Sequence, residues 1–109
     1  MQPSGIFLMD KRAGFSSAQA IAFLKRRLDI KKIGHAGTLD PFATGLLVCL
    51  VNSATKLADQ FQAGIKTYSG VIKLGLVTDT DDITGNILSE SQDLPTEQAI
   101  ISAAESFRG

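Results

Sequence analysis

The chain has 109 residues, of which 44% are hydrophobic, and its 11 Lys+Arg balance 11 Asp+Glu to give zero net charge. This composition indicates a globular domain with one core and excludes a disordered chain or a wholly basic nucleic-acid arm. The single Cys49 excludes an internal disulfide and a cysteine-based metal site, and its apolar neighbours predict a buried, inert thiol. No signal-peptide pattern and no run of about 20 apolar residues is present, which predicts a cytoplasmic protein without membrane contact.

The first thirty residues predict a strand, a turn and a helix. The apolar run 6–9 is typical of a strand, and the polar residues 10–14 are typical of a turn. Ser16 or Ser17 then caps a helix that runs to about Leu28. Apolar residues at helical spacing mark the face that packs on the core. These are Ile21, Leu24 and Leu28.

A cluster of basic residues lies in the last turn of this helix and just beyond it. Its members are Lys25, Arg26, Arg27, Lys31 and Lys32. The negative end of the helix dipole favours cations at this position, but the cluster exceeds that need. We therefore expect a basic patch beside the loop that follows, able to contact the phosphates of a nucleic acid.

The segment 34–47 combines the only histidine, three glycines, a proline and one aspartate. Glycines at positions 34, 37 and 45 permit backbone angles closed to other residues, and Pro41 fixes its own φ and extends Asp40. We therefore expect a stiff loop, neither helix nor strand, that presents the Asp40 carboxylate. The alternative is a tight connection in which Asp40 only caps a turn.

The rest of the chain alternates short strands and helices. Residues 46–51 are apolar at odd and even positions alike, which predicts a strand covered on both faces. Further expected elements are a helix over 54–62, a strand over 67–77, an acidic loop over 78–85, a strand over 86–89 and a helix capped by Thr96. Without a regular βαβ rhythm, the fold class is α+β, with a mixed, mainly antiparallel sheet and flanking helices.

Neither a metal site nor a nucleotide phosphate loop is expected. His35 and Asp40 have no further ligands near them in the sequence. The acidic residues of 79–90 match three positions of a calcium loop, but Ile83 and Thr84 stand where that template needs an oxygen ligand and a glycine. A solvated turn, or one acid that pairs with a nearby basic residue, is the simpler interpretation of these acids. The glycine-rich loop also fails the phosphate-loop pattern.

Lys66 and Tyr68 stand two residues apart, and on a strand they would share one face. Tyr68 is the only tyrosine in the chain. An aromatic ring at the edge of a site can stack on a nucleic-acid base. The alternative is a pair that packs across neighbouring strands.

The chain resembles the TruB-type tRNA pseudouridine synthases in the run Gly34-His35-Ala36-Gly37-Thr38-Leu39-Asp40-Pro41, followed by Ala43-Thr44-Gly45. Four further segments agree with the family in order and spacing. They are Asp10-Lys11 with Gly14 and Ser16-Ser17; Ala54-Thr55-Lys56; Lys66-Thr67-Tyr68; and Leu74-Gly75 with Thr78-Asp79-Thr80-Asp81-Asp82 and Gly85. The similarity runs from about Gly5 to the end of the chain.

The resemblance implies an isomerase that converts a uridine in the T-loop of transfer RNA to pseudouridine, with no cofactor and no metal. The base leaves the RNA stack, its bond from N1 to the sugar breaks, and C5 rejoins the sugar. Asp40 would be the catalytic carboxylate, as nucleophile or as base. Substrate-binding residues would be Tyr68, stacked on the uracil, His35 beside the base, and Asp82. Lys11 and Lys66 would join them at the site, where they would contact the RNA or support the loop. The loop would be shaped by Gly34, Gly37, Thr38, Leu39 and Pro41.

Two residues depart from the family pattern, because Arg12 replaces a proline and Asn52 stands where a glycine is common. Family members are also much longer, and the arginine that pairs with the catalytic aspartate lies in their second half. The resemblance therefore implies that residues 1–109 are a single partial domain, the N-terminal half of the catalytic domain, without the C-terminal half or any RNA-binding domain. Alone, this piece would be inactive and open to self-association. Alternative functions are a non-catalytic RNA-binding relative, a paralogue acting on ribosomal RNA, and a metal-dependent hydrolase using the acidic loop.

Overall fold

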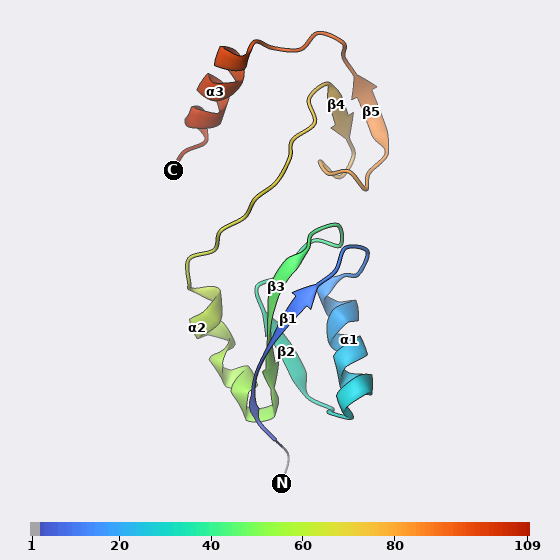
Figure 1. Ribbon diagram of the computed structural model, residues 1–109, viewed down its shortest axis with the longest axis vertical. Coiled ribbons are helices and arrows are strands. Elements are labelled where there is room, and N and C mark those ends of the chain that lie inside the picture. Colours follow the sequence, from blue (N-terminus) through green and yellow to red (C-terminus); the bar gives the residue numbers. More distant parts are fainter. Residues whose placement is uncertain (1–2) are drawn as a thin grey trace. The chain divides into compact units, whose positions relative to one another are not determined.

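The computed structural model describes residues 3–109, which divide into two compact units, one up to Thr67 and one from Tyr68 to Gly109 (Figure 1). Between Gln62 and Leu76 no residue belongs to a helix or a strand. Within the described residues, no helix is long and apolar enough to cross a membrane.

The first unit is built on a three-stranded sheet in the order β1-β3-β2. β1 spans Gly5–Lys11, β2 spans Ile33–Ala36 and β3 spans Gly45–Val51. The apolar run of β3 takes the central position, where a strand has neighbours on both sides. Every pair of described strands is antiparallel, and the predicted α+β class is confirmed.

Helix α1 spans Ser17–Leu28, and Ser16 is its cap. The Ser16 side chain accepts the N–H of Gln19, and the Gln19 side chain accepts the N–H of Ser16, which is a capping box. The helix ends at Asp29, whose φ of 52° places it in the left-handed region. Ser16 therefore caps the start of the helix through hydrogen bonds, and the side chain of Ser17 is free for another contact.

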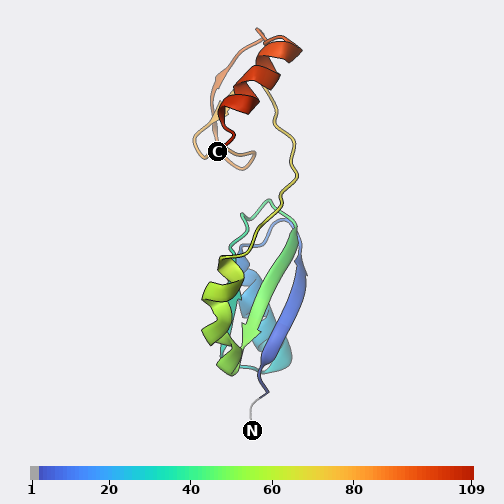
Figure 2. The same cartoon turned by 90° about the vertical axis from the view of Figure 1, so that its left-hand side faces the viewer.

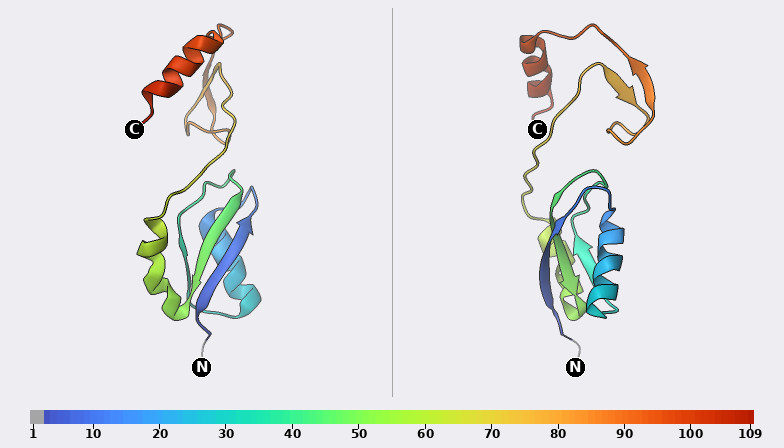
Figure 3. Two further views of the ribbon diagram at one scale, coloured as in Figure 1. Left: turned by 60° about the vertical axis from the view of Figure 1, so that its left-hand side comes forward. Right: turned by 45° about the vertical axis from the view of Figure 1, so that its right-hand side comes forward.

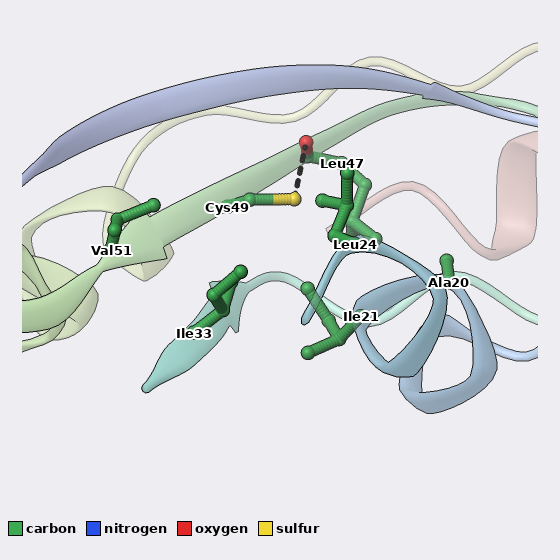
Figure 4. Packing of buried hydrophobic residues seen from close by; sticks show 7 residues of the cluster. All are labelled: Ala20, Ile21, Leu24, Ile33, Leu47, Cys49 and Val51. Carbon is green, nitrogen blue, oxygen red and sulfur yellow. Dashed lines mark hydrogen bonds between the residues drawn. The ribbon is translucent and has the colours of Figure 1, made fainter. Parts of the chain in front are cut away.

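Residues at odd positions of β3 pack against α1. The cluster consists of Ala20, Ile21, Leu24, Ile33, Leu47, Cys49 and Val51 (Figure 4). Cys49 is fully buried, and its thiol donates to the carbonyl oxygen of Leu47 at 3.6 Å. Burial raises the pKa of the Cys49 thiol, which disfavours the reactive thiolate. The predicted buried cysteine is confirmed.

The opposite face of the sheet is covered by the 3₁₀-helix η1, Asn52–Leu57, and by α2, Ala58–Gln62 (Figure 2). Leu50 is fully buried there, in a cluster with Ala54. The cover does not reach the other end of this face, where Leu8 and Leu46 are 64% and 62% exposed. β3 is therefore covered on both faces only over its second half, and the prediction of full cover is wrong for its first residues.

The second unit contains a hairpin and a helix. β4, Leu76–Thr78, pairs with β5, Ile87–Glu90, and α3 spans Glu97–Ser106. The side chain of Thr96 accepts the N–H of Ala99, so the predicted cap is confirmed.

The strand predicted over 67–77 is wrong except for its last two residues. Figure 3 shows the segment before β4 as an extended trace, and its residues Val71 and Ile72 are 98% and 86% exposed. Apolar residues alternate only partly here, and a strand needs a hydrogen-bonded neighbour that the described residues do not supply.

Candidate active site

The Asp40 side chain stands on the connection between β2 and β3. The N–H of Ala43 donates to the carbonyl oxygen of Asp40 at 2.9 Å, which closes a β-turn with Pro41 in its second position. Proline favours that position because its φ is already set. Asp40 is exposed, and its carboxylate accepts no hydrogen bond and pairs with no cation among residues 3–109. The loop therefore contains a tight turn and presents the carboxylate, and the alternative in which the Asp40 side chain only caps that turn is wrong.

Only part of the segment 34–47 is irregular. Gly34 and His35 lie in β2, so the prediction that they belong to a loop is wrong; pairing with the central strand overrides the glycine. Gly34 has no positive φ, whereas Gly37 (φ 79°) and Gly45 (φ 126°) do. These two glycines flank the loop at angles that other residues rarely adopt.

Lys11 holds the loop from the end of β1. Its side chain is buried, with 1% exposure. The ammonium donates to three backbone carbonyl oxygens, those of Phe15 at 2.7 Å, Arg12 at 2.9 Å and Pro41 at 3.3 Å. Of the two roles that the resemblance allows for Lys11, support of the loop agrees with these contacts. The N–H of Gly14 donates to the same Pro41 oxygen at 2.8 Å.

Ser17 holds the other side of the loop and was missed by the sequence analysis. Its hydroxyl accepts the N–H of Leu39 at 2.9 Å and donates to the carbonyl oxygen of Leu39 at 3.1 Å. The side chain is buried, with 2% exposure. One signal was present: two adjacent serines compete for one cap, which leaves the second free. Lys11 and Ser17 together fix the residues on both sides of Asp40.

His35 and Lys66 lie at the base of this loop. In β2, His35 pairs with Cys49, and its Nδ1 is buried without a hydrogen-bond partner in the described part of the chain. Lys66 donates to the carbonyl oxygens of Gln62 and Gly64. A Cβ built on Gly37 would meet Lys66 Cε at 3.5 Å, so the lysine stem lies against the loop.

Tyr68 and Asp82 belong to the second unit. The tyrosine is 70% exposed, and because it and Lys66 lie outside any strand, the prediction that they share a strand face is wrong. Asp82 Oδ1 accepts from the hydroxyls of Thr80 at 2.8 Å and Thr84 at 2.5 Å and from the N–H of Thr84 at 2.8 Å. Its Oδ2 accepts no hydrogen bond within residues 3–109.

We expect the Asp82 carboxyl to titrate below its usual pKa of 3.8, because Thr84 and then Thr80 stabilise its charged form. A lowered pKa in the folded state stabilises the hairpin above the unfolded-state pKa, and this contribution is lost as pH falls through the folded-state pKa. Carboxyl ¹³C shifts against pH measure the midpoint. Thr84→Val should raise it and Ser89→Ala should not; a midpoint at or above 3.8 contradicts the hydrogen-bonding account.

The backbone at Gly85 lies too close to its neighbours in the hairpin loop to carry a side chain. A Cβ there would stand 2.3 Å from Thr80 Oγ1 and 2.5 Å from Asp79 Oδ1. Asp79 Oδ1 accepts the N–H of Asn86 at 2.8 Å. Asp79 and Asp82 thus accept hydrogen bonds from the backbone and side chains of their own loop. Among residues 3–109 no group of three or more His, Cys, Asp or Glu side chains is placed to hold a metal ion.

The backbone angle at Asn52 explains why asparagine can replace the glycine that is common at this position of the family pattern. Its φ is 52°, in the left-handed region that glycine tolerates best and asparagine tolerates better than most other residues. Its side chain donates to the carbonyl oxygen of Pro3. An asparagine at this glycine position therefore preserves the backbone turn that leads from β3 into η1.

The basic cluster does not lie beside the loop, and that prediction is wrong. α1 begins next to the loop, through the bonds of Ser17 to Leu39, and the basic residues stand at its other end (Figure 1). The 12 residues of α1 span about 18 Å. Lys32 and Gly34 are close in sequence, but β2 carries the chain along the sheet before the loop begins.

Comparison with known proteins shows which family this chain matches. The N-terminal domain model of the TruB family of pseudouridylate synthases matches residues 25–109. The tRNA pseudouridine synthase B of Acholeplasma laidlawii is 51% identical over 88 residues, which cover 81% of this chain and 32% of the relative. That of Protochlamydia amoebophila is 47% identical over 106 residues, which cover 96% of this chain and 40% of the relative. The chain thus spans about a third to two fifths of these relatives.

Proposed function

Because the chain belongs to the TruB family of pseudouridylate synthases, we propose that it forms part of a tRNA pseudouridine synthase. Its reaction would be the isomerisation of a T-loop uridine in transfer RNA to pseudouridine. The relatives' shared name, tRNA pseudouridine synthase B, supports the substrate and the reaction. The observation on this chain that carries the proposal is the Asp40 carboxylate, exposed and unpaired among the described residues, on a backbone held at Leu39 and Pro41.

The reaction breaks the bond from N1 to the sugar C1′ and forms a bond from C5 to the same carbon. The proton of C5 leaves and N1 gains one, so atoms balance without an oxidant or a cofactor. A carboxylate can serve this exchange as a nucleophile or as a base. Either role needs Asp40 within contact distance of the nucleoside, and a backbone held on both sides supplies that placement without ordering on binding.

Other side chains would bind the substrate. Tyr68 offers an exposed ring for stacking on the extruded uracil. His35 and Lys66 stand at the base of the Asp40 loop, and the resemblance assigns His35 to the side of the extruded base. Asp82 has one free carboxylate oxygen for a polar group of the substrate.

We propose further that residues 1–109 are the N-terminal half of the catalytic domain of a cytoplasmic enzyme. Their coverage of 40% of the Protochlamydia relative supports this division. Leu8 and Leu46 leave an apolar part of the first sheet uncovered, which a further part of a longer chain could bury. In its absence, the same surface favours self-association of the 109-residue chain.

The proposal is tested with a hybrid in which residues 1–109 replace the aligned segment of the Protochlamydia amoebophila relative. We expect the hybrid to release tritium from C5-labelled uridine in a T-stem-loop RNA, because the new C5 bond displaces that hydrogen. The 109-residue chain alone should release little or none. A folded hybrid that binds the RNA without releasing tritium would favour the non-catalytic RNA-binding alternative.

A further inference from the structure

The five side chains of the basic cluster are free to contact a partner. Arg26, Arg27, Lys31 and Lys32 are exposed and Lys25 is half-buried. In the described part of the chain, none of the five donates a side-chain hydrogen bond, and the ion pair that is present joins Arg108 to Glu105 instead. Residues 25–32 carry five cations against one carboxylate, that of Asp29, and the excess of positive charge is repulsive, so a solvated surface alone does not require that arrangement.

The backbone beneath these cations is held in place. The N–H of Ile30 donates to the carbonyl oxygen of Lys25 at 3.2 Å, and the N–H of Asn52 donates to that of Lys32 at 2.9 Å. Ile30 packs against the core and Ile33 is buried in it. The cluster is therefore a fixed array of charges on the first unit rather than a mobile tail.

The charge of the chain is divided between its two units. The sequence up to Thr67 contains nine lysines and arginines against four aspartates, a net charge of +5, and the sequence from Tyr68 contains two against seven, a net charge of −5. The zero total therefore conceals a strongly basic unit. A positive field of this kind raises the rate and affinity of association with a polyanion.

We propose that the basic cluster is a second RNA-contact surface, which binds phosphates about one helix length, roughly 18 Å, from the Asp40 loop. This inference rests on the proposed function, because it takes RNA as the partner. Arginine forks and lysine ammonium groups bind phosphate oxygens, and such contacts position RNA without reading its sequence. An RNA that places its target base at Asp40 must extend along the first unit to reach the cluster.

RNA fits this surface better than an anionic membrane does. A helix that lies on a bilayer inserts its apolar face, but Ile21 and Leu24 of α1 are already buried in the core. Phe23 and Leu28 are exposed singly and do not form such a face. Phosphates presented along a stiff RNA stem suit a fixed array of charges.

The test measures the salt dependence of RNA binding by the 109-residue chain. Lys31→Gln with Lys32→Gln removes two charges from the cluster, and Lys73→Gln with Arg108→Gln is the control with an equal change in charge in the second unit. Each is titrated by fluorescence anisotropy with a complete tRNA and with a T-loop hairpin too short to reach the cluster. Losing two phosphate contacts should lower the slope of log Kd against log salt for tRNA by roughly 1.4–1.8.

The control variant and the short hairpin should show no such change. Equal slopes for the two variants on tRNA would overturn the proposal, and so would an equal loss on both RNAs, which would place the cluster beside the target base. Loss of binding to phosphatidylglycerol vesicles with unchanged tRNA binding would assign the surface to a membrane instead. A changed slope together with an inactive hybrid would preserve this surface while rejecting the proposed catalysis, so the two failures are distinguishable.

Discussion

Asp40→Asn is expected to abolish pseudouridine formation by the hybrid while RNA binding persists. Asparagine has nearly the same shape, but it can neither attack as an anion nor accept a proton at neutral pH. Loss of a positioned acid or base costs roughly 10²- to 10⁴-fold in rate, and loss of a nucleophile costs more. Binding should hold because the exposed Asp40 side chain forms no hydrogen bond or ion pair among residues 3–109, and removing a negative charge near phosphates does not weaken attraction.

The matched control for this variant is Asp59→Asn. Asp59 is an exposed aspartate of the same unit, in α2, and its loss makes an equal change in net charge. Tritium release and the Kd of a T-stem-loop RNA are measured on both variants. Turnover by Asp40→Asn within a few-fold of the unsubstituted hybrid would reject Asp40 as the catalytic carboxylate and return it to the role of a turn residue.

Lys11→Met is expected to destabilise the first unit by about 3 kcal/mol, because three carbonyl oxygens lose a charged donor in a buried position. Methionine retains most of the volume of the lysine stem, so the loss reports the hydrogen bonds. Hydrogen exchange of the β3 amides measures the free energy of unfolding of this unit by itself. Release of the loop should also lower the turnover of the hybrid by about 100-fold, the effect of a displacement near 1 Å at a reacting group.

Two further variants separate loop support from general stability. Ser17→Ala removes the contacts to Leu39 and should cost about 1–2 kcal/mol, with a fall in turnover and little change in RNA affinity. Lys56→Met, at an exposed lysine of η1, should change the stability by less than about 0.5 kcal/mol. If Lys11→Met behaved like Lys56→Met, the ammonium would not hold the loop.

Local signals in the sequence predicted much of the secondary structure. Ser16 and Thr96 cap helices because a hydroxyl beside an apolar periodic run can accept a free backbone N–H. The apolar residues of β3 predicted a strand covered on both faces, which holds for its second half. Asp40 before proline predicted a turn that presents a carboxylate, and the surrounding motif identified the family before any geometry was known.

Interactions between segments far apart in sequence decided the rest. Gly34 and His35 form a strand because β3 pairs with them, although glycines favoured a loop. Residues 63–75 belong to no helix or strand, because no described strand pairs with them.

The sequence by itself determined the family, the fold class and the candidate carboxylate, since each depends on residue types at short spacing. Only the tertiary structure decided that Lys11 and Ser17 hold the loop around Asp40. Their hydrogen-bond partners lie far away in the sequence, and folding brings these backbone atoms within reach. It also separated the basic cluster from that loop by the length of α1, since a helix and a strand convert nearness along the chain into distance in space.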